Sequence, residues 1–389
     1  MFKKMPVLLL LAISLIGITH QLIPYQVKSY LYAISLLIKS MIIFVLPFLI
    51  FGLLFKTAIK LAKKSSKAIL VILLAVCLSN LASTLIACSI GVFVYNFDIS
   101  LTFPESVKKL NPAFLIEFPS LISNSYAMFL GLISGVIMGR LNFKWLEQVT
   151  NKVDSIVNVF FKLILLSVPM FIIGFSVQMF HDQVMLNIVK SYFKIFTIIF
   201  LSLIVYIGFF YLAVCRFNFR HFFNNLKGML PGVLTGMASM SSATAMPFTI
   251  ISVEKNSKES DLAKSIVPAT INIHLIGDCF AITIFAFAIL KGFDLPLPDF
   301  LSCITFAIYF VIAKFSVAAV PGGGVLIMLP ILEKYLGFNG TMLSLITALY
   351  VLFDPLITGA NVFGNGAFSL GLCKFLKKGT RGPAPESTL

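Results

Sequence analysis

The sequence has 389 residues, of which 59% are hydrophobic and only 12% are charged, and its mean hydropathy is +1.01. Soluble domains are about 45–50% apolar and about 25% charged, so this composition excludes a soluble globular protein and indicates an integral membrane protein. In that setting the net charge of +15 indicates basic residues at the membrane edges rather than a nucleic-acid surface, and the six cysteines lack metal-ligand or disulfide-framework spacing.

Apolar runs separated by charged residues predict a polytopic, all-α membrane protein. The basic start and apolar core of the first run resemble a signal peptide, but no small-x-small cleavage site follows, so we expect an uncleaved first helix. The expected spans are 5–24, 29–58, 69–95, 113–139, 153–180, 185–215, 265–290 and 341–372. Most lysines and all arginines then fall on the side of the N-terminus, which predicts that both termini are cytoplasmic.

The region 228–253 does not fit a single crossing, because basic clusters both precede and follow it. A segment that enters the membrane and returns on the same side would leave both clusters in the cytoplasm. Its serine-rich centre, SMSSATAMP, would let two half-helices pack closely, and we expect Pro247 to break the helix there. The pattern therefore predicts a re-entrant hairpin.

The region 300–332 carries a second interruption, VPGGG, with no charge beside it to mark an ordinary loop. It predicts another re-entrant hairpin, entered from the external side. Two interrupted segments in one half of a chain are typical of a transporter whose substrate site lies near the middle of the membrane.

Asp278 and Asp354 both lie well inside apolar spans. Intramembrane carboxylates are costly, which makes them candidates for a functional site. Capping or backbone hydrogen bonding is the structural alternative for both. The polar residues around them are Thr270, Asn272, His274, Thr358, Asn361 and Asn365.

Together these segments resemble the dicarboxylate/amino acid:cation symporter family, which has the glutamate-transporter fold. The similar stretches are the serine-rich tip, ATIN at 269–272, VPGGG at 320–324 and DPLITGANVFGN at 354–365. The resemblance implies eight transmembrane helices, two re-entrant hairpins, inverted repeats, an elevator mechanism and a homotrimer. It implies scaffold helices in 1–68 and 97–184, transport-domain segments in 69–96 and 185–372, and a cytoplasmic tail in 373–389.

The resemblance also implies a set of substrate-binding residues, in which Asp354 would accept a substrate amino group. The full set is Ser241, Ser242, Thr244, Pro321, Gly322, Gly323, Asp354, Ile357, Thr358 and Asn361. Relatives that carry acidic substrates have an arginine at the position of Ile357, or in the first hairpin at the position of Met240. A second substrate carboxylate would lack that bidentate partner here, so we expect a neutral amino acid.

Ion coupling departs from the family pattern, because His274 and Asn365 replace two aspartates that bind sodium in relatives. The expected cation-coupling residues are Ser83, Thr84, Asn272, His274, Asp278, Asn361 and Asn365, with Asn272 and Asn361 as possible Na⁺ ligands. We expect His274 and Asp278 to share a helix face, where they could carry a proton in place of Na⁺. The sequence therefore leaves Na⁺ and H⁺ open as coupling ions, and it indicates no other cofactor.

Two alternatives remain open. One is a symporter of C4-dicarboxylates or acidic amino acids, in which a lysine or hairpin amides replace the arginine. The other is an uncoupled channel-like or structural membrane protein. Since no P-loop, GxSxG or HExxH motif occurs, we expect a transporter rather than an enzyme. The resemblance further implies that it lies in a bacterial inner membrane.

Overall fold

The computed structural model describes residues 15–63, 67–96, 110–119, 121–122, 124–141, 143, 145–181, 185–315, 317 and 323–380. Its helices are α2 (Tyr25–Lys63), α3 (Lys67–Asn96), α4 (Asn124–Leu141), α5 (Leu146–His181), α6 (Met185–Val214), α7 (Phe219–Ser239), α8 (Ser242–Ser257), α9 (Ser260–Thr270), α10 (Ile276–Gly292), α11 (Phe300–Lys314), α12 (Gly323–Leu336) and α13 (Gly340–Thr380). The prediction of an all-helical chain is confirmed for these residues. Half of the first expected span, 5–24, lies outside them, because they begin at residue 15.

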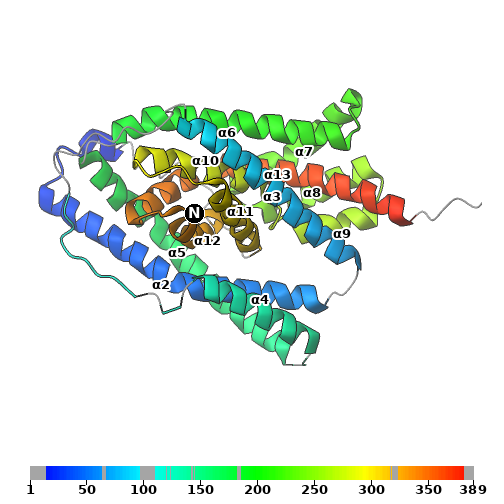
Figure 1. Cartoon of the computed structure of the whole chain (residues 1–389), viewed down its shortest axis with the longest axis horizontal. Helices are drawn as coiled ribbons and strands as arrows, with labels where there is room; N and C mark the ends of the chain where they lie inside the picture. The colour runs from blue at the N-terminus through cyan, green and yellow to red at the C-terminus, as the bar shows by residue number, and fades with distance from the viewer. Residues whose placement is uncertain are drawn as a thin grey trace, which may run out of the picture.

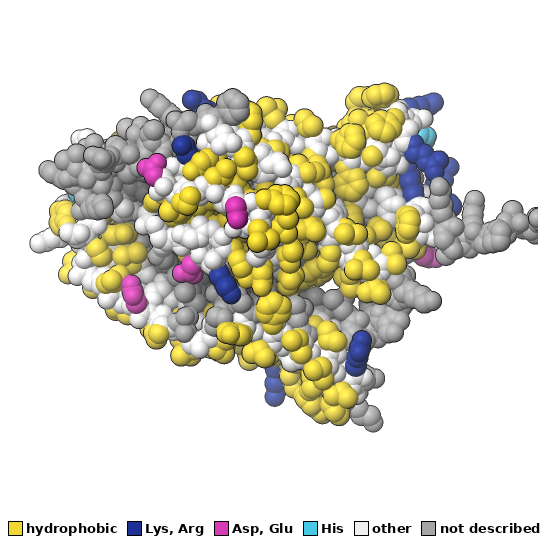
Figure 2. All heavy atoms as spheres, in the orientation of Figure 1, with side chains coloured by type: hydrophobic (Ala, Val, Ile, Leu, Met, Phe, Trp, Pro, Cys, Tyr) yellow, Lys and Arg dark blue, Asp and Glu magenta, His cyan; other side chains and the backbone are white. Residues whose placement is uncertain are grey.

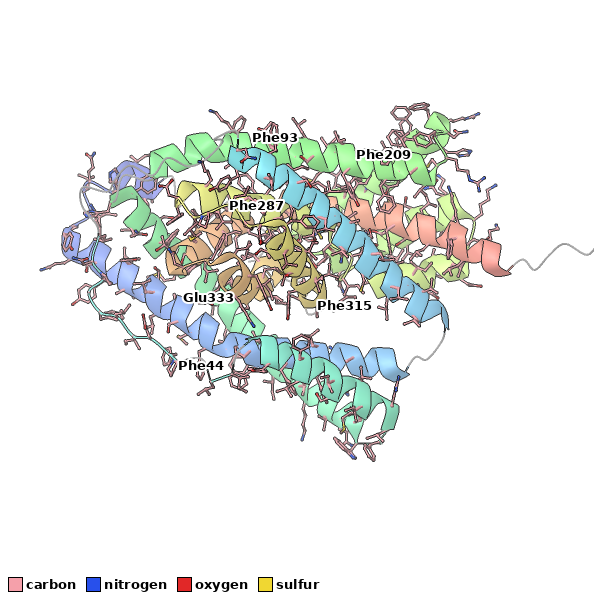
Figure 3. All side chains as sticks on the ribbon, in the orientation of Figure 1. Phe44, Phe93, Phe209, Phe287, Phe315 and Glu333 are labelled. Carbon is pink, nitrogen blue, oxygen red and sulfur yellow. The ribbon has the colours of Figure 1, made fainter. Side chains whose placement is uncertain are left out.

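Three helical segments in the described part are long and apolar enough to cross a membrane: Leu70–Asn96, Phe193–Val214 and Gly340–Lys377. Their outer sides carry exposed apolar side chains. Phe93 of α3 and Phe209 of α6 are 49% and 60% exposed and lie on the outside of the bundle (Figure 3). Such exposed aromatic groups suit a lipid environment. The count of eight spans and the elevator movement stay predictions.

The helices form two packed groups. One contains α2, α4 and α5, and in the other α3 and α6 lie over α10 and α13 (Figure 1). Gly135 lets α4 approach α2 closely, since an added Cβ would lie 2.5 Å from the backbone oxygen of Phe55. The expected division into scaffold and transport domains stays a prediction.

Helix α10 lies at the centre of the second group, and nearly every one of its residues is buried. A helix that is apolar all round is stable only when other helices surround it. Phe287 fills the contact with α3 (Figure 3), where an added Cβ on Gly91 would lie 2.6 Å from its ring. The core therefore fixes the first turn of α10, which bears Asp278.

The first predicted hairpin consists of α7 and α8. Its arms, 219–239 and 242–257, are longer than the expected 228–253, and they meet at Met240, whose φ of 50° is left-handed. The expectation that Pro247 breaks the helix is wrong: Pro247 lies inside α8, and the break falls at Met240 and Ser241 instead. The antiparallel arms bring their basic ends together, and basic side chains gather at that end in Figure 2.

The second predicted hairpin consists of α11 and α12, which pack against each other. Asp299 caps α11 by accepting a hydrogen bond from the N–H of Ser302 at 2.8 Å. Hydrogen bonds from the Ser302 side chain and backbone lower the pKa of the Asp299 carboxyl. The tip lies partly outside the described residues, which resume at Gly323. In Figure 1 this hairpin lies to the left of α7 and α8.

Two expected helices differ from the structure. The expected span 265–290 is divided into α9 and α10, with an unwound segment from Ile271 to Leu275 between them. The expected last span, 341–372, is longer, because α13 continues to Thr380 with Pro355 inside it. Residues 373–380 of the predicted tail are therefore helical.

Candidate functional site

Segments far apart in the sequence enclose a small polar cavity of about 30 Å³. It lies where both hairpin tips meet the unwound segment, the start of α10 and the middle of α13. That volume holds about one or two water molecules and is too small for an amino acid. The lining residues are Met240, Ser241, Ser242, Asn272, Leu275, Asp278, Val317, Gly324, Tyr350, Asp354, Thr358 and Asn361.

Asp278 is the most densely bonded side chain at the cavity. Its Oδ2 accepts from Lys314 Nζ at 2.7 Å, and its Oδ1 accepts from Tyr350 Oη at 2.9 Å and from Asn361 Nδ2 at 2.8 Å. The carboxylate lies in the first turn of α10, where the helix dipole also favours a negative charge. It is therefore stabilised as an anion although it is almost completely buried.

Asp354 is the second carboxylate of the cavity and is 3% exposed. It lies on α13 one turn before Thr358, whose hydroxyl donates to its Oδ1 at 2.9 Å. Ser241 and Ser242 face it from the first hairpin, at the N-terminus of α8. A helix N-terminus attracts a carboxylate and Asp354 attracts an ammonium group, so the two sides of the cavity suit the two ends of a zwitterion.

Asn272 lies in the unwound segment and also lines the cavity. Its Oδ1 is buried and has no hydrogen-bond partner in the described part of the chain. Buried polar atoms without partners are uncommon and mark places where a ligand or ion can bind. No cluster of three or more His, Cys, Asp or Glu occurs among the described residues, so a cation here would rely on neutral oxygens and single carboxylates.

Polar residues of α3 hold the unwound segment. Asn80 spans it, because its Nδ2 donates to Ile273 O at 2.7 Å and its Oδ1 accepts from Leu275 N at 3.2 Å. Thr84 donates to Asn80 O, and Ser83 donates to Ser79 O at 2.8 Å and to Tyr206 Oη at 3.0 Å. Neither of these two hydroxyl residues is among those that line the cavity.

The expectation that His274 and Asp278 share a helix face is wrong. The Nε2 of His274 lies 2.8 Å from Ser79 Oγ, and its ring stacks on Phe368 with centroids 4.0 Å apart. Because the helix is interrupted before Leu275, His274 and Asp278 do not share a helix face, and Asp278 bonds Lys314 instead.

Other expected site residues lie elsewhere. Asn365 donates to Thr270 Oγ1 at 2.9 Å, away from the cavity, and Thr244 is exposed on α8. Gly323 is buried at the start of α12 next to the lining residue Gly324. Pro321 and Gly322 lie outside the described residues.

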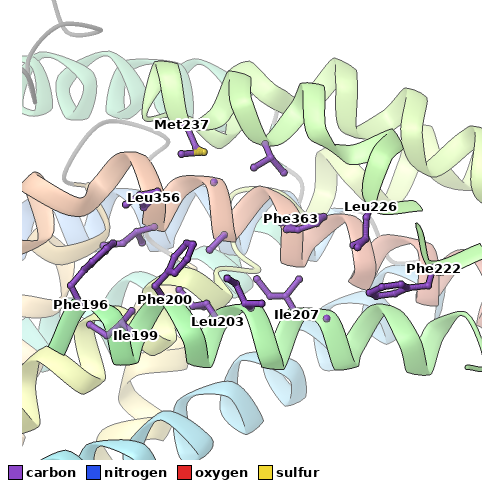
Figure 4. Close-up of a pocket in the computed structure, with 16 residues that line it drawn as sticks. Phe196, Ile199, Phe200, Leu203, Ile207, Phe222, Leu226, Met237, Leu356 and Phe363 are labelled. Carbon is purple, nitrogen blue, oxygen red and sulfur yellow. The ribbon is translucent and has the colours of Figure 1, made fainter. Parts of the chain in front are cut away.

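Ile357 lines a second, larger cavity of about 430 Å³ between α6, α7 and α13 (Figure 4). Its walls are apolar and include Phe196, Phe200, Met237 and Phe363. Such walls offer no partner for a charged substrate group. The polar cavity is therefore the better candidate for a transport site.

Sequence reasoning missed Lys314 and Tyr350, which bind Asp278. Lys314 was detectable, because it is an isolated lysine in the apolar stretch YFVIAKFSVAAV, and an intramembrane cation is as costly as an intramembrane carboxylate. Tyr350 resembles an ordinary core aromatic residue in the sequence.

The profile of the sodium:dicarboxylate symporter family matches residues 5–375, nearly the whole chain. No individual curated protein matches the chain significantly. The match includes both hairpins, the interrupted helix and α13. The chain therefore belongs to the sodium:dicarboxylate symporter family, which carries dicarboxylates or amino acids across membranes together with cations.

Proposed function

We propose that this family member is a secondary active transporter that carries a neutral amino acid together with a cation. The observation that supports this most is the charge around the polar cavity. Two carboxylates, Asp278 and Asp354, line it, and no lysine or arginine is among the lining residues. The ammonium group of Lys314, which is not among the lining residues, contacts Asp278. The two carboxylates and this ammonium group together have a formal charge of −1.

A zwitterionic substrate suits that balance. Its ammonium group would pair with Asp354, and its carboxylate would accept hydrogen bonds from Asn361, Ser242 and the N-terminus of α8. A dicarboxylate would bring two negative charges to a site that is already negative. Without a guanidinium partner, its second carboxylate would be buried at a cost of several kcal/mol.

The dicarboxylate alternative has one observation in its favour, which is the presence of a lysine at the site. However, Lys314 is 0% exposed and its ammonium bonds Asp278 at 2.7 Å. It would have to leave Asp278 to reach a substrate, and Asp278 would then be a buried anion without its main partner.

The coupling cation is Na⁺ or H⁺ in this proposal. The oxygen atoms of Asn272 and Asp354 are the groups at the cavity that could bind Na⁺ as the substrate enters. We further propose a bacterial inner-membrane location with both termini cytoplasmic, a homotrimer, and an elevator movement of α3 and α6–α13 against α2, α4 and α5.

Uptake by purified protein in proteoliposomes tests the proposal. A panel of neutral amino acids, acidic amino acids and C4-dicarboxylates would be offered under separate sodium and pH gradients. We expect saturable uptake of a neutral amino acid, driven by one of the gradients. Uptake of C4-dicarboxylates without competition by any amino acid would contradict the substrate, and uptake that never exceeds equilibrium would indicate a channel.

A further inference from the structure

Lys314 is the last residue of α11 and lies at the tip of the second hairpin. Its side chain is 0% exposed and its neighbours along the chain are apolar. Lysine side chains near membranes usually extend to water, and a lysine that stays inside does so only when specific partners replace its hydration.

Those partners form a complete cation site. The Lys314 Nζ lies 2.7 Å from Asp278 Oδ2 and 3.3 Å from the backbone oxygen of Gly324, and it lies 4.6 Å from the centre of the Phe310 ring. One carboxylate, one carbonyl oxygen and one aromatic face are groups that bind a monovalent cation.

The surroundings are shaped for this contact. An added Cβ on Gly324 would lie 2.3 Å from Asp278 Oδ2 and 2.4 Å from Tyr350 Oη, so only glycine permits α12 to approach so closely. Tyr350 and Asn361 occupy the other carboxylate oxygen of Asp278. The carboxylate thus faces the lysine with one oxygen and α13 with the other.

We propose that the Lys314 ammonium group is a tethered cation that occupies this site permanently. It joins the tip of the second hairpin to α10, a task that a dissolved Na⁺ bound between the hairpin and Asp278 could otherwise perform. The hairpin of this transporter therefore closes without a mobile ion at Asp278. The inference rests on the proposed function. With Lys314 bound to Asp278, the coupling ion of that function would bind in another part of the cavity, next to Asn272 and Asp354.

The variant Lys314→Ala tests the inference, because it removes the ammonium group and leaves the oxygen atoms in place. Melting temperatures of the purified full-length protein would be measured in choline chloride, sodium chloride and ethylammonium chloride at equal ionic strength. We expect the wild-type melting temperature to be the same in choline chloride and in ethylammonium chloride, because Lys314 already occupies the site at Asp278. The variant should melt lower in choline chloride and recover saturably in sodium or ethylammonium chloride.

Lys334→Ala is the matched control, since Lys334 is an exposed lysine on the same hairpin and lies 5.4 Å from the centre of the Tyr335 ring. It should melt like the wild type in each of the three salts. Saturable stabilisation of the wild type by ethylammonium, or a Lys314→Ala protein that gains no more from either cation than the wild type does, would overturn the proposal.

A double variant, Lys314→Met with Asp278→Asn, keeps the test decisive if Lys314→Ala does not fold. It removes both charges, so we expect it to fold better than Lys314→Ala and to gain nothing from ethylammonium. A double variant that folds no better than Lys314→Ala would contradict the inference. These melting measurements need no substrate, so the tethered cation and the proposed amino-acid transport are tested separately. Either proposal can be contradicted while the other is supported.

Discussion

Asn361 contacts Asp278 twice: its Nδ2 donates to the Asp278 carboxylate at 2.8 Å, and its Oδ1 accepts from the Asp278 backbone N–H at 3.2 Å. One amide side chain therefore satisfies both a buried charge and one of the first N–H groups of α10, which have no partner within their own helix. The pair joins the middle of α13 to the start of α10. Each end of this contact also lines the polar cavity.

Replacing Asn361 by alanine should remove both bonds, which leaves the buried Asp278 N–H without its side-chain acceptor and leaves Tyr350 as the remaining donor to Asp278 Oδ1. We expect the variant to lose about 1–3 kcal/mol of stability and most of its transport. Thermal unfolding in detergent and uptake in proteoliposomes would measure the two effects. Asn256→Ala is the control, because in the described part of the chain the Asn256 amide bonds Ser252 of its own helix, and it should change stability by less than about 0.5 kcal/mol. Equal effects of the two substitutions would contradict this role of Asn361.

A methyl group at Gly324 should prevent the second hairpin from closing. It would overlap the Asp278 carboxylate and the Tyr350 hydroxyl, and overpacking of this kind costs about 1–3 kcal/mol. We expect Gly324→Ala to lower the melting temperature and to make cysteines introduced near the tip react faster with a water-soluble thiol reagent. Gly208→Ala on α6 is the control, since nothing lies within 4 Å of the added Cβ there. Unchanged labelling in Gly324→Ala would show that the hairpin tolerates the methyl group.

An arginine placed in the polar cavity should change the substrate. Met240 lines that cavity, so Met240→Arg would supply the guanidinium group that a second carboxylate needs. We expect competition by acidic amino acids or dicarboxylates to increase at least tenfold relative to neutral amino acids. Ile357→Arg is the contrasting variant, because Ile357 lines the apolar cavity of Figure 4, where an arginine would be buried without a partner. If only Ile357→Arg gained acidic substrates, our placement of the substrate site would be wrong.

The sequence predicted a helical chain, interruptions within the regions of α7–α8 and α11–α12, and several of the polar residues that line the cavity, because small residues and charges inside apolar runs are local signals. It did not predict which partners these residues have. The unwound segment between α9 and α10 was not expected, since the bonds from Asn80 that stabilise it come from a helix nearly 200 residues away. For the same reason His274 was expected on the same helix face as Asp278, although the unwound segment places its ring next to Ser79.

The most direct measurement is the accumulation ratio of a labelled neutral amino acid in proteoliposomes under an inward cation gradient, for the wild type and for Asp354→Asn together. Glu333→Gln, which removes an exposed acid from the second hairpin (Figure 3), serves as the control. The account predicts accumulation above the external concentration for the wild type and the control, and at least a hundredfold slower uptake for Asp354→Asn, because the substrate ammonium group loses its buried counter-charge. Undiminished amino-acid accumulation by Asp354→Asn would contradict it.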